Sequence, residues 1–126
     1  MILLTVDEVI LLHEKLIAAT GGTPGLRDRG LLESAVFGIN AGFEDVEQYP
    51  TVEQKAARLA YALIANHAFV DGNKRIGILS MLIILDLNRT VLQYTQQELI
   101  ALGLSAAEGK SGYHEILAWI MSHRSS

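Results

Sequence analysis

The chain has 126 residues, half of them hydrophobic and none of them cysteine, and its formal net charge is −4. This length fits one domain, residues 1–126, that buries roughly two thirds of its unfolded surface without disulfides. The composition excludes disulfides, thiolate metal sites and a cysteine nucleophile, and its acidic balance disfavours nucleic-acid binding, which requires a basic face.

The N-terminal segment predicts two helices. In "TVDE", Thr5 can cap backbone amides while Glu8 reaches back, as in a capping box. Apolar residues then recur at helical spacing as far as position 17, and the helix should end near "TGGTPG", residues 20–25. His13 lies on this apolar face without a spaced partner, so we interpret it as structural. A second helix should begin near Asp28 and continue through "GLLESAVFGI".

The segment "NAGFEDVEQYP", residues 40–50, has no helical period. Its glycine, acidic residues and closing proline predict a loop, with at most a short extended piece. An alternative is that its part "GFEDVEQY", residues 42–49, is a flap that guides a target peptide by strand-like pairing. A second capping box, "TVEQ" at 51–54, then opens a third helix whose apolar stripe ends at His67.

A fourth helix is expected from about Asn73 to Asn88. It is apolar nearly all round, so it should be the central, buried helix. Its apolar run of 12 residues is too short for a membrane span, which requires ~20 residues. The N-terminus has no basic region followed by a long apolar one, so we expect no signal peptide and no membrane segment.

Two further helices complete the chain. "TQQE" at 95–98 opens a fifth helix that should stop at Gly109, and Ser111 opens a sixth. Helices at this density with short connections predict an all-α fold, a compact single-domain bundle of about six helices.

The nine residues "HAFVDGNKR", 67–75, join the third helix to the fourth. Lys74 and Arg75 stand at the beginning of an apolar helix, where the helix dipole disfavours a cation by ~0.3–1 kcal/mol. Such local conflicts are expected mainly at functional sites. A phosphate chain, held by the first backbone amides of the helix and the two cations, would resolve the conflict.

Neighbouring residues fit a site that transfers a phosphorus-containing group. Asp71 could hold Mg²⁺ together with substrate phosphates, and His67 could accept the proton of an attacking hydroxyl. Phe69 is expected to pin the turn to the core, and Gly72 is free to adopt positive φ. The alternatives are an Asp71 that only caps the fourth helix, and cations that only extend into solvent.

The nine-residue motif resembles the signature of the Fic/Doc family, roughly H-x-F-x-[D/E/N]-[G/A]-N-[G/K]-R. The segments "VDEVILLHEKL" and "GGTPGLRDRGLLESAV" also resemble its Doc (death-on-curing) branch, so the resemblance covers most of the chain. It implies a compact helical bundle with the motif between two helices. It further implies that His67 is the catalytic base, that Asp71 is the Mg²⁺ ligand and that Phe69 is a structural anchor.

The resemblance also implies a phosphate-binding set. Gly72 lets the backbone approach the ligand, Asn73 positions phosphate and Arg75 binds it. AMP-transferring members usually have glycine at the position of Lys74 and a further arginine at the position of Ile78. Doc-like toxins carry Asn-Lys-Arg, as here, and are thought to bind ATP in the reverse orientation and to transfer the γ-phosphate. Lys74 is therefore expected to help hold phosphate.

These features lead us to expect a cytoplasmic toxin of a toxin–antitoxin system, a kinase that uses ATP and Mg²⁺. The implied target is a threonine of elongation factor Tu, whose modification blocks translation. No inhibitory motif of the form [S/T]-x-x-x-E-[G/N] is present, since the segment from Ser105 to Gly109 is one residue short. A small antitoxin that binds in a surface groove is therefore expected. The alternatives are AMP transfer to a protein hydroxyl and a nucleotide-binding module without catalysis.

Overall fold

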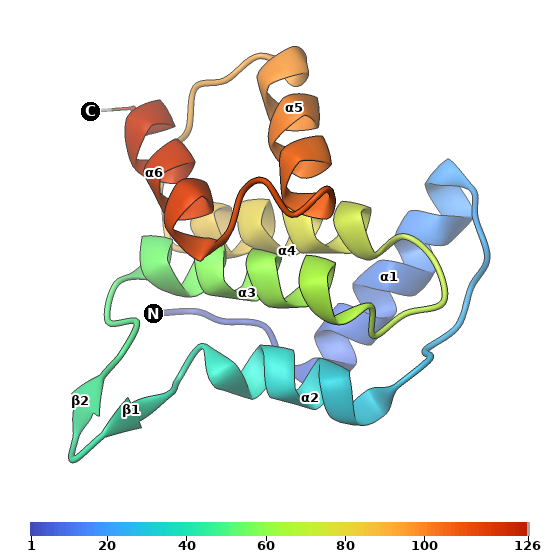
Figure 1. Cartoon of the computed structure of the whole chain (residues 1–126), viewed down its shortest axis with the longest axis horizontal. Coiled ribbons are helices and arrows are strands. Elements are labelled where there is room, and N and C mark those ends of the chain that lie inside the picture. Colours follow the sequence, from blue (N-terminus) through green and yellow to red (C-terminus); the bar gives the residue numbers. More distant parts are fainter. Residues whose placement is uncertain (126) are drawn as a thin grey trace.

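Six helices and one short hairpin make up the computed structural model, which describes residues 1–125 (Figure 1). The predicted all-α fold is confirmed, and the hairpin is the extended piece in the segment 40–50. The helices are α1 Val6–Thr20, α2 Arg29–Gly38, α3 Val52–Asn66, α4 Asn73–Leu87, α5 Gln96–Ala107 and α6 Tyr113–His123. The hairpin consists of β1 Gly42–Phe43 and β2 Val46–Glu47, antiparallel, with Phe43 opposite Val46.

The helix starts are set by local hydrogen bonds that the sequence predicts well. All three predicted capping boxes are formed, with both reciprocal hydrogen bonds in place, by Thr5 and Glu8, Thr51 and Gln54, and Thr95 and Glu98. The sixth helix differs, because its N-cap is Gly112 rather than Ser111. The Ser111 hydroxyl instead lies 2.7 Å from the hydroxyl of Ser105, so it ties the helix connection to α5.

The core lies between α3 and α4, which run side by side in Figure 1 and carry the motif in the loop that joins them. α3 packs against α2, α4, α5 and α6, and α4 packs against α1, α3 and α5. Gly77 explains how closely α3 and α4 approach. A Cβ at this position would lie 2.7 Å from the Ile64 side chain and 3.0 Å from the carbonyl oxygen of Ala60.

The outer face of α4 is apolar but only half-buried, and it lines a groove of about 460 Å³. We call this the α4–α5 groove. Its apolar wall comes from three helices, with Leu16 of α1, Ile78, Leu79 and Leu82 of α4, and Leu99 and Ile100 of α5. α4 is therefore apolar all round because one of its faces packs in the core and another lines the groove. Within residues 1–125, no helix combines the length and the hydrophobicity that crossing a bilayer requires.

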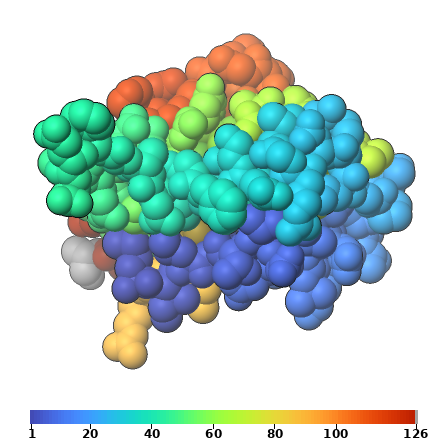
Figure 2. Space-filling view, turned by 90° about the horizontal axis from the view of Figure 1, so that it is seen from below, coloured from blue at the N-terminus to red at the C-terminus, as the bar shows by residue number. Residues whose placement is uncertain are grey.

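A buried lysine holds the hairpin end of the molecule together. Lys55 is 2% exposed, and its Nζ donates hydrogen bonds to the Ile39 carbonyl (2.8 Å) and to Asn40 Oδ1 (3.2 Å). The Glu47 carboxylate on β2 lies 3.4 Å away. Figure 2 shows the face on which α2 and the N-terminal part of the chain lie alongside each other, with the hairpin projecting at one end. Lys55 thus links α3 to the end of α2 and to β2.

Replacing Lys55 by methionine keeps the aliphatic volume but removes the ammonium group that contacts Ile39, Asn40 and Glu47. We expect Lys55→Met to lower the free energy of unfolding by about 1–3 kcal/mol, because the buried bond to the Ile39 carbonyl is lost together with the bond to Asn40. Urea denaturation measures the change. Lys15→Met, at an exposed position of α1, is the matched control and should change stability by no more than about 0.5 kcal/mol. Equal stability of the two variants would contradict the role of Lys55.

α5 and α6 are joined by a histidine–carboxylate pair. His123 Nε2 lies 2.6 Å from Glu98 Oε2, and the imidazole stacks on Trp119. The pKa of His123 is raised above its ordinary value of 6.5, mainly by the hydrogen bond to Glu98 and also by the hydrogen bond to the Trp119 carbonyl. The pKa of Glu98 is lowered from 4.5 to about 2, mainly by the hydrogen bond from the Thr95 backbone N–H and also by the hydrogen bond with His123. Both shifts favour the charged pair in the folded protein.

The pair predicts a pH-dependent stability. Since the pKa of His123 is raised on folding, its contribution is complete below pH 6.5 and is lost as pH rises through the folded value. The contribution of Glu98 is complete above pH 4.5 and is lost as pH falls toward 2. Urea midpoints of the wild type and of His123→Gln should therefore differ most between pH 4.5 and 6.5 and converge at alkaline pH. A difference that grows at alkaline pH would contradict this.

Candidate active site

The motif loop, residues 67–72, begins where α3 ends. The predicted apolar stripe of the third helix included His67, and this prediction is wrong. The helix stops at Asn66, and His67 is an exposed C-cap residue in the left-handed conformation (φ 51°, ψ 49°). A non-glycine residue in this region costs about 1–2 kcal/mol. Its carbonyl oxygen accepts a 2.7 Å hydrogen bond from Arg27 Nε, and the residue is exposed.

Phe69 anchors the loop in the core. It is 2% exposed, and its ring stacks on the buried ring of His13 at 3.8 Å. The Asn73 side chain brackets the Phe69 backbone, accepting from its N–H and donating to its carbonyl, both at 3.0 Å. On the other side, Phe69 forms an antiparallel bridge with Leu26. The interpretation of His13 as structural agrees with these contacts, since His13 Nε2 also lies 2.7 Å from the Asp71 carbonyl oxygen.

Asp71 does not cap the fourth helix. The N-cap of α4 is Gly72, in the left-handed conformation (φ 76°), and it supplies no side-chain hydrogen bond. The two Asp71 carboxylate oxygens instead accept from the backbone N–H groups of Thr23 (3.0 Å) and Gly72 (2.8 Å). These two donors, and then the nearby Arg75, hold the pKa of the Asp71 carboxyl below its ordinary value of 3.8. The carboxylate is therefore ionised at neutral pH.

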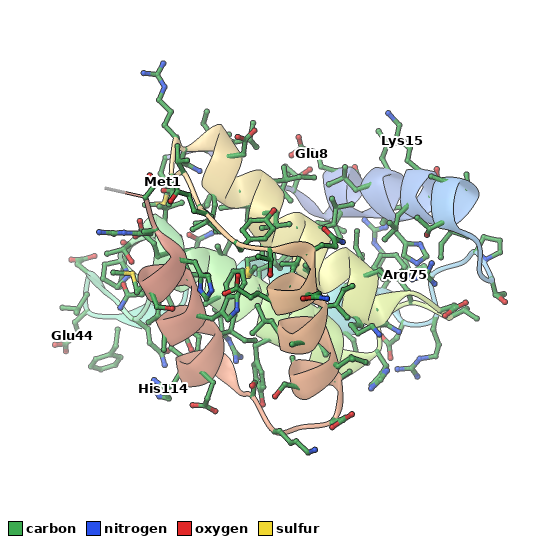
Figure 3. All side chains as sticks on the ribbon, turned by 90° about the horizontal axis from the view of Figure 1, so that it is seen from above. Met1, Glu8, Lys15, Glu44, Arg75 and His114 are labelled. Atoms are coloured by element: carbon green, nitrogen blue, oxygen red, sulfur yellow. The ribbon has the colours of Figure 1, made fainter. Side chains whose placement is uncertain are left out.

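The two cations of the motif have different surroundings. Arg75 Nη1 donates to Thr20 Oγ1 and to the Gly21 carbonyl, each at 2.7 Å, and Nη2 lies 3.6 Å from Asp71 Oδ1. Figure 3 shows Arg75 at the end of the molecule where α4 begins and α1 ends. Lys74 is exposed, and its aliphatic stem lies against Gly103 of α5. Its ammonium group has no hydrogen-bond or ion-pair partner among residues 1–125.

A cavity of about 450 Å³, here called the motif pocket, is lined by residues 67 and 70–75 and by Ala107 at the end of α5. Within the described chain, the backbone N–H groups of Asn73, Lys74 and Arg75 donate no hydrogen bond, as expected for the first turn of a helix. An anion is favoured at this position by the helix dipole and by the exposed Lys74. The pocket thus brings together the imidazole of His67, one carboxylate and a cationic helix end.

The donor set fits a magnesium ion that is shared with substrate phosphates. No cluster of three or more histidine, aspartate or glutamate side chains that could enclose a metal occurs in residues 1–125. Asp71 supplies a single ionised carboxylate, with one backbone hydrogen bond to each oxygen. Mg²⁺ characteristically binds through one or two carboxylates and completes its shell with phosphate and water. Asp71 is suited to that arrangement.

The segment between α1 and α2 contributes site residues that the sequence reasoning missed. The sequence indicated only that the first helix ends there, yet the backbone of residues 25–28 pairs with the motif loop. Gly22, at φ 119°, lies so close to the motif that a Cβ would be 2.6 Å from Asp71 Oδ2 and 2.9 Å from Arg75 Nη2. The consecutive glycines were the available signal, because such residues permit close backbone approach.

The hairpin does not lie over the motif pocket. It precedes α3 whereas the motif follows α3, and a helix of 15 residues is about 22 Å long. In Figure 3, Glu44 at the hairpin tip and Arg75 stand at opposite ends of the molecule. The alternative in which residues 42–49 form a flap over the site is therefore contradicted by the fold. The segment that does border the motif is 22–28.

Comparison with known proteins agrees with this architecture. The model of the Fic/DOC family matches residues 3–85, which include α1 to α3, the whole motif and α4 except for its last two residues. "Toxin Doc" of Mycolicibacterium smegmatis is 49% identical over 57 residues, which cover 45% of this chain and 44% of that protein. "Protein kinase doc" of Escherichia phage P1 is 32% identical over 104 residues, covering 82% of this chain and 81% of that protein.

The family match covers well over half of the chain, and the phage relative aligns along most of both sequences. The matched region contains the motif loop together with the α1–α2 segment that supports it. The chain therefore belongs to the Fic/Doc family, and the similarity to these two proteins supports the Doc branch of that family.

Proposed function

We propose that this protein is a Doc-like toxin that transfers the γ-phosphate of Mg-ATP to a protein hydroxyl. The observation that carries the proposal is the motif pocket, which is lined both by the exposed His67 and by the uncapped N-terminus of α4. An ionised carboxylate stands at the same helix end. A general base, a metal ligand and an anion site are the parts that phosphoryl transfer requires. One relative is named a toxin and the other a protein kinase, which supports the same reading.

In the proposed reaction, the oxygen of the target hydroxyl forms a bond to the γ-phosphorus of ATP. The bond between that phosphorus and the bridging oxygen of ADP breaks, and ADP leaves with the bond electrons. His67 accepts the hydroxyl proton, since its side chain is exposed and it lines the motif pocket. Asp71 would hold Mg²⁺, which supplies charge neutralisation on the phosphates when bound. The amides of Asn73, Lys74 and Arg75, together with the Lys74 ammonium, hold the phosphate oxygens.

Lys74 and Ile78 favour phosphoryl transfer over AMP transfer. AMP-transferring members of the family usually have a second arginine where this chain has Ile78, and Ile78 contributes to the apolar α4–α5 groove rather than to the motif pocket. The pocket therefore has no second arginine from α4 beyond Arg75, and Lys74 is its exposed cation. AMP transfer is the second candidate, and a nucleotide-binding module without turnover is the third.

The α4–α5 groove is the proposed site of the antitoxin. It is lined mainly by aliphatic side chains of three helices, a surface that suits the apolar face of an amphipathic helix. Lys74 and Arg75 border both the groove and the motif pocket, so a helix in the groove would stand next to the phosphate site. We therefore propose a small antitoxin as partner, located in the cytoplasm with the toxin. The proposed target, a threonine of elongation factor Tu, rests on the family resemblance alone.

The reaction class is tested with the purified chain, Mg²⁺, elongation factor Tu and ATP labelled at either the α- or the γ-phosphate. We expect label on the target from the γ-position only. His67→Ala should reduce the transfer rate by about 10²–10⁴-fold, the usual contribution of a general base, with the circular dichroism spectrum unchanged. Transfer of the α-label would instead establish AMP transfer, and ATP binding without any transfer would favour the binding module.

The assignment of Lys74 is tested separately. We expect Lys74→Gly to weaken transfer of the γ-phosphate, because the exposed ammonium is removed from the phosphate site while the helix amides remain. Lys15→Ala removes an exposed lysine from α1, outside the motif pocket, and should leave transfer unchanged. Steady-state kinetics with varied ATP measures both variants. Unchanged kinetics in Lys74→Gly would show that this lysine does not distinguish the Doc branch in mechanism.

A further inference from the structure

We propose that Arg27, outside the nine-residue motif, is a positioning residue that holds His67 in its left-handed conformation and so directs the imidazole into the motif pocket. The effect on catalysis rests on the function proposed above, but the conformational effect does not. Arg27 contacts the backbone of the motif loop and does not line the motif pocket itself. It would therefore act through His67 rather than on the substrate.

The end of α3 offers Arg27 two acceptors. The last carbonyl groups of a helix have no partner within the helix, and a cation near them also complements the helix dipole. Arg27 Nε donates to the His67 carbonyl at 2.7 Å and Nη2 donates to the Asn66 carbonyl at 3.2 Å. The planar guanidinium can bond both oxygens at once, which fixes the direction of successive peptide groups. A lysine has no such fork.

The conformation held in this way decides where the imidazole lies. If α3 continued in the right-handed helical conformation, position 67 would follow Leu63 and Ile64 by four and three residues, on their face of the helix. Both of these residues are buried, so the side chain would turn toward the core. With φ at 51°, His67 is instead exposed and lines the motif pocket. Exposure of the proposed base therefore depends on one unfavourable backbone conformation.

Arg27 is itself fixed in place by the backbone around it. Its own N–H and that of Asp28 both donate to the Ala68 carbonyl, at 2.8 and 2.9 Å. Leu26 pairs with Phe69, and the N–H of Val70 donates to the Gly25 carbonyl. Backbone hydrogen bonds from this segment thus hold the residues that follow His67. The guanidinium holds His67 and the residue before it. Because the backbone of Arg27 is fixed in this way, its side chain can hold His67 in the left-handed conformation.

Arg29 provides a matched control. It is also exposed and lies two residues further along the chain, at the start of α2, but it bonds Glu33 (3.1 Å) and approaches Asp7 (3.6 Å). None of its polar contacts reaches the motif loop. Removing either arginine changes the net charge by the same amount, so a difference between the two variants reports the contacts of Arg27 rather than its charge.

The decisive measurement is the conformation of residue 67 by NMR, in the wild type, Arg27→Ala, Arg27→Lys and Arg29→Ala. A positive φ brings the amide and α protons of one residue close together and gives a strong intraresidue NOE. We expect this NOE at His67 in the wild type and in Arg29→Ala, and a marked loss in Arg27→Ala. Arg27→Lys should restore it only in part and keeps the test valid if Arg27→Ala folds poorly. A full-strength NOE in both Arg27 variants would overturn the proposal.

Kinetics supplies the second readout. We expect kcat to fall about tenfold or more in Arg27→Ala, the equivalent of losing a charged hydrogen bond, while KM for ATP stays within about twofold. KM is spared because the phosphate site is at the start of α4, which Arg27 does not contact. An equal loss in Arg29→Ala, or unchanged kcat in Arg27→Ala, would contradict the catalytic part. If the wild type transfers no phosphate, the proposed function fails, and the NMR result still decides the role of Arg27.

Discussion

The bracket that Asn73 forms on the backbone of Phe69 is the interaction on which the candidate site depends. Two hydrogen bonds of 3.0 Å join the first residue of α4 to a buried residue four positions earlier. They close the motif loop into a fixed shape, so α4 begins at the pocket with its first amides unpaired. The bracket uses the Asn73 Oδ1 and one N–H of its side-chain amide, so its backbone N–H and the second side-chain N–H are the donors it can offer to an anion. The fold creates the helix end, and the bracket fixes its position.

The electrostatic conflict at this helix end is partly resolved within the protein. Arg75 is not a free cation, since it bonds the end of α1 and stands beside Asp71. Lys74, which is exposed and lines the pocket, is therefore the charge that a bound anion would mainly compensate. Arg75 and Asp71 together fasten α4 to α1 and to the segment around Thr23. An incoming phosphate chain would meet a preorganised surface rather than a loose pair of side chains.

The parts of the structure that could be predicted from the sequence are those that local interactions determine. Three helix starts follow from capping boxes whose partners are three residues apart, and the motif was located because its residues are contiguous. The contributions of Arg27, Thr23 and Gly22 could not be found in this way, because their partners are some 40 to 50 residues distant. Periodicity also misplaced His67, since a stripe cannot reveal that the helix ends one residue before it.

The distribution of hydrogen bonds divides the motif into two groups of side chains. Phe69, Asn73 and Arg75 are engaged in building the loop, through stacking on His13, the backbone bracket and the contacts to α1. His67 and Lys74 have exposed, uncommitted side-chain groups within the described chain, and Asp71 retains acceptor capacity beside its two backbone donors. Damage to the first group should disturb conformation and ligand binding together, because the loop itself changes. Substitution of His67 or Lys74 should leave the loop intact, whereas substitution of Asp71 would also remove its bonds to Thr23 and Gly72. We therefore propose that the chemistry of the site lies with His67, Lys74, Asp71 and the helix amides.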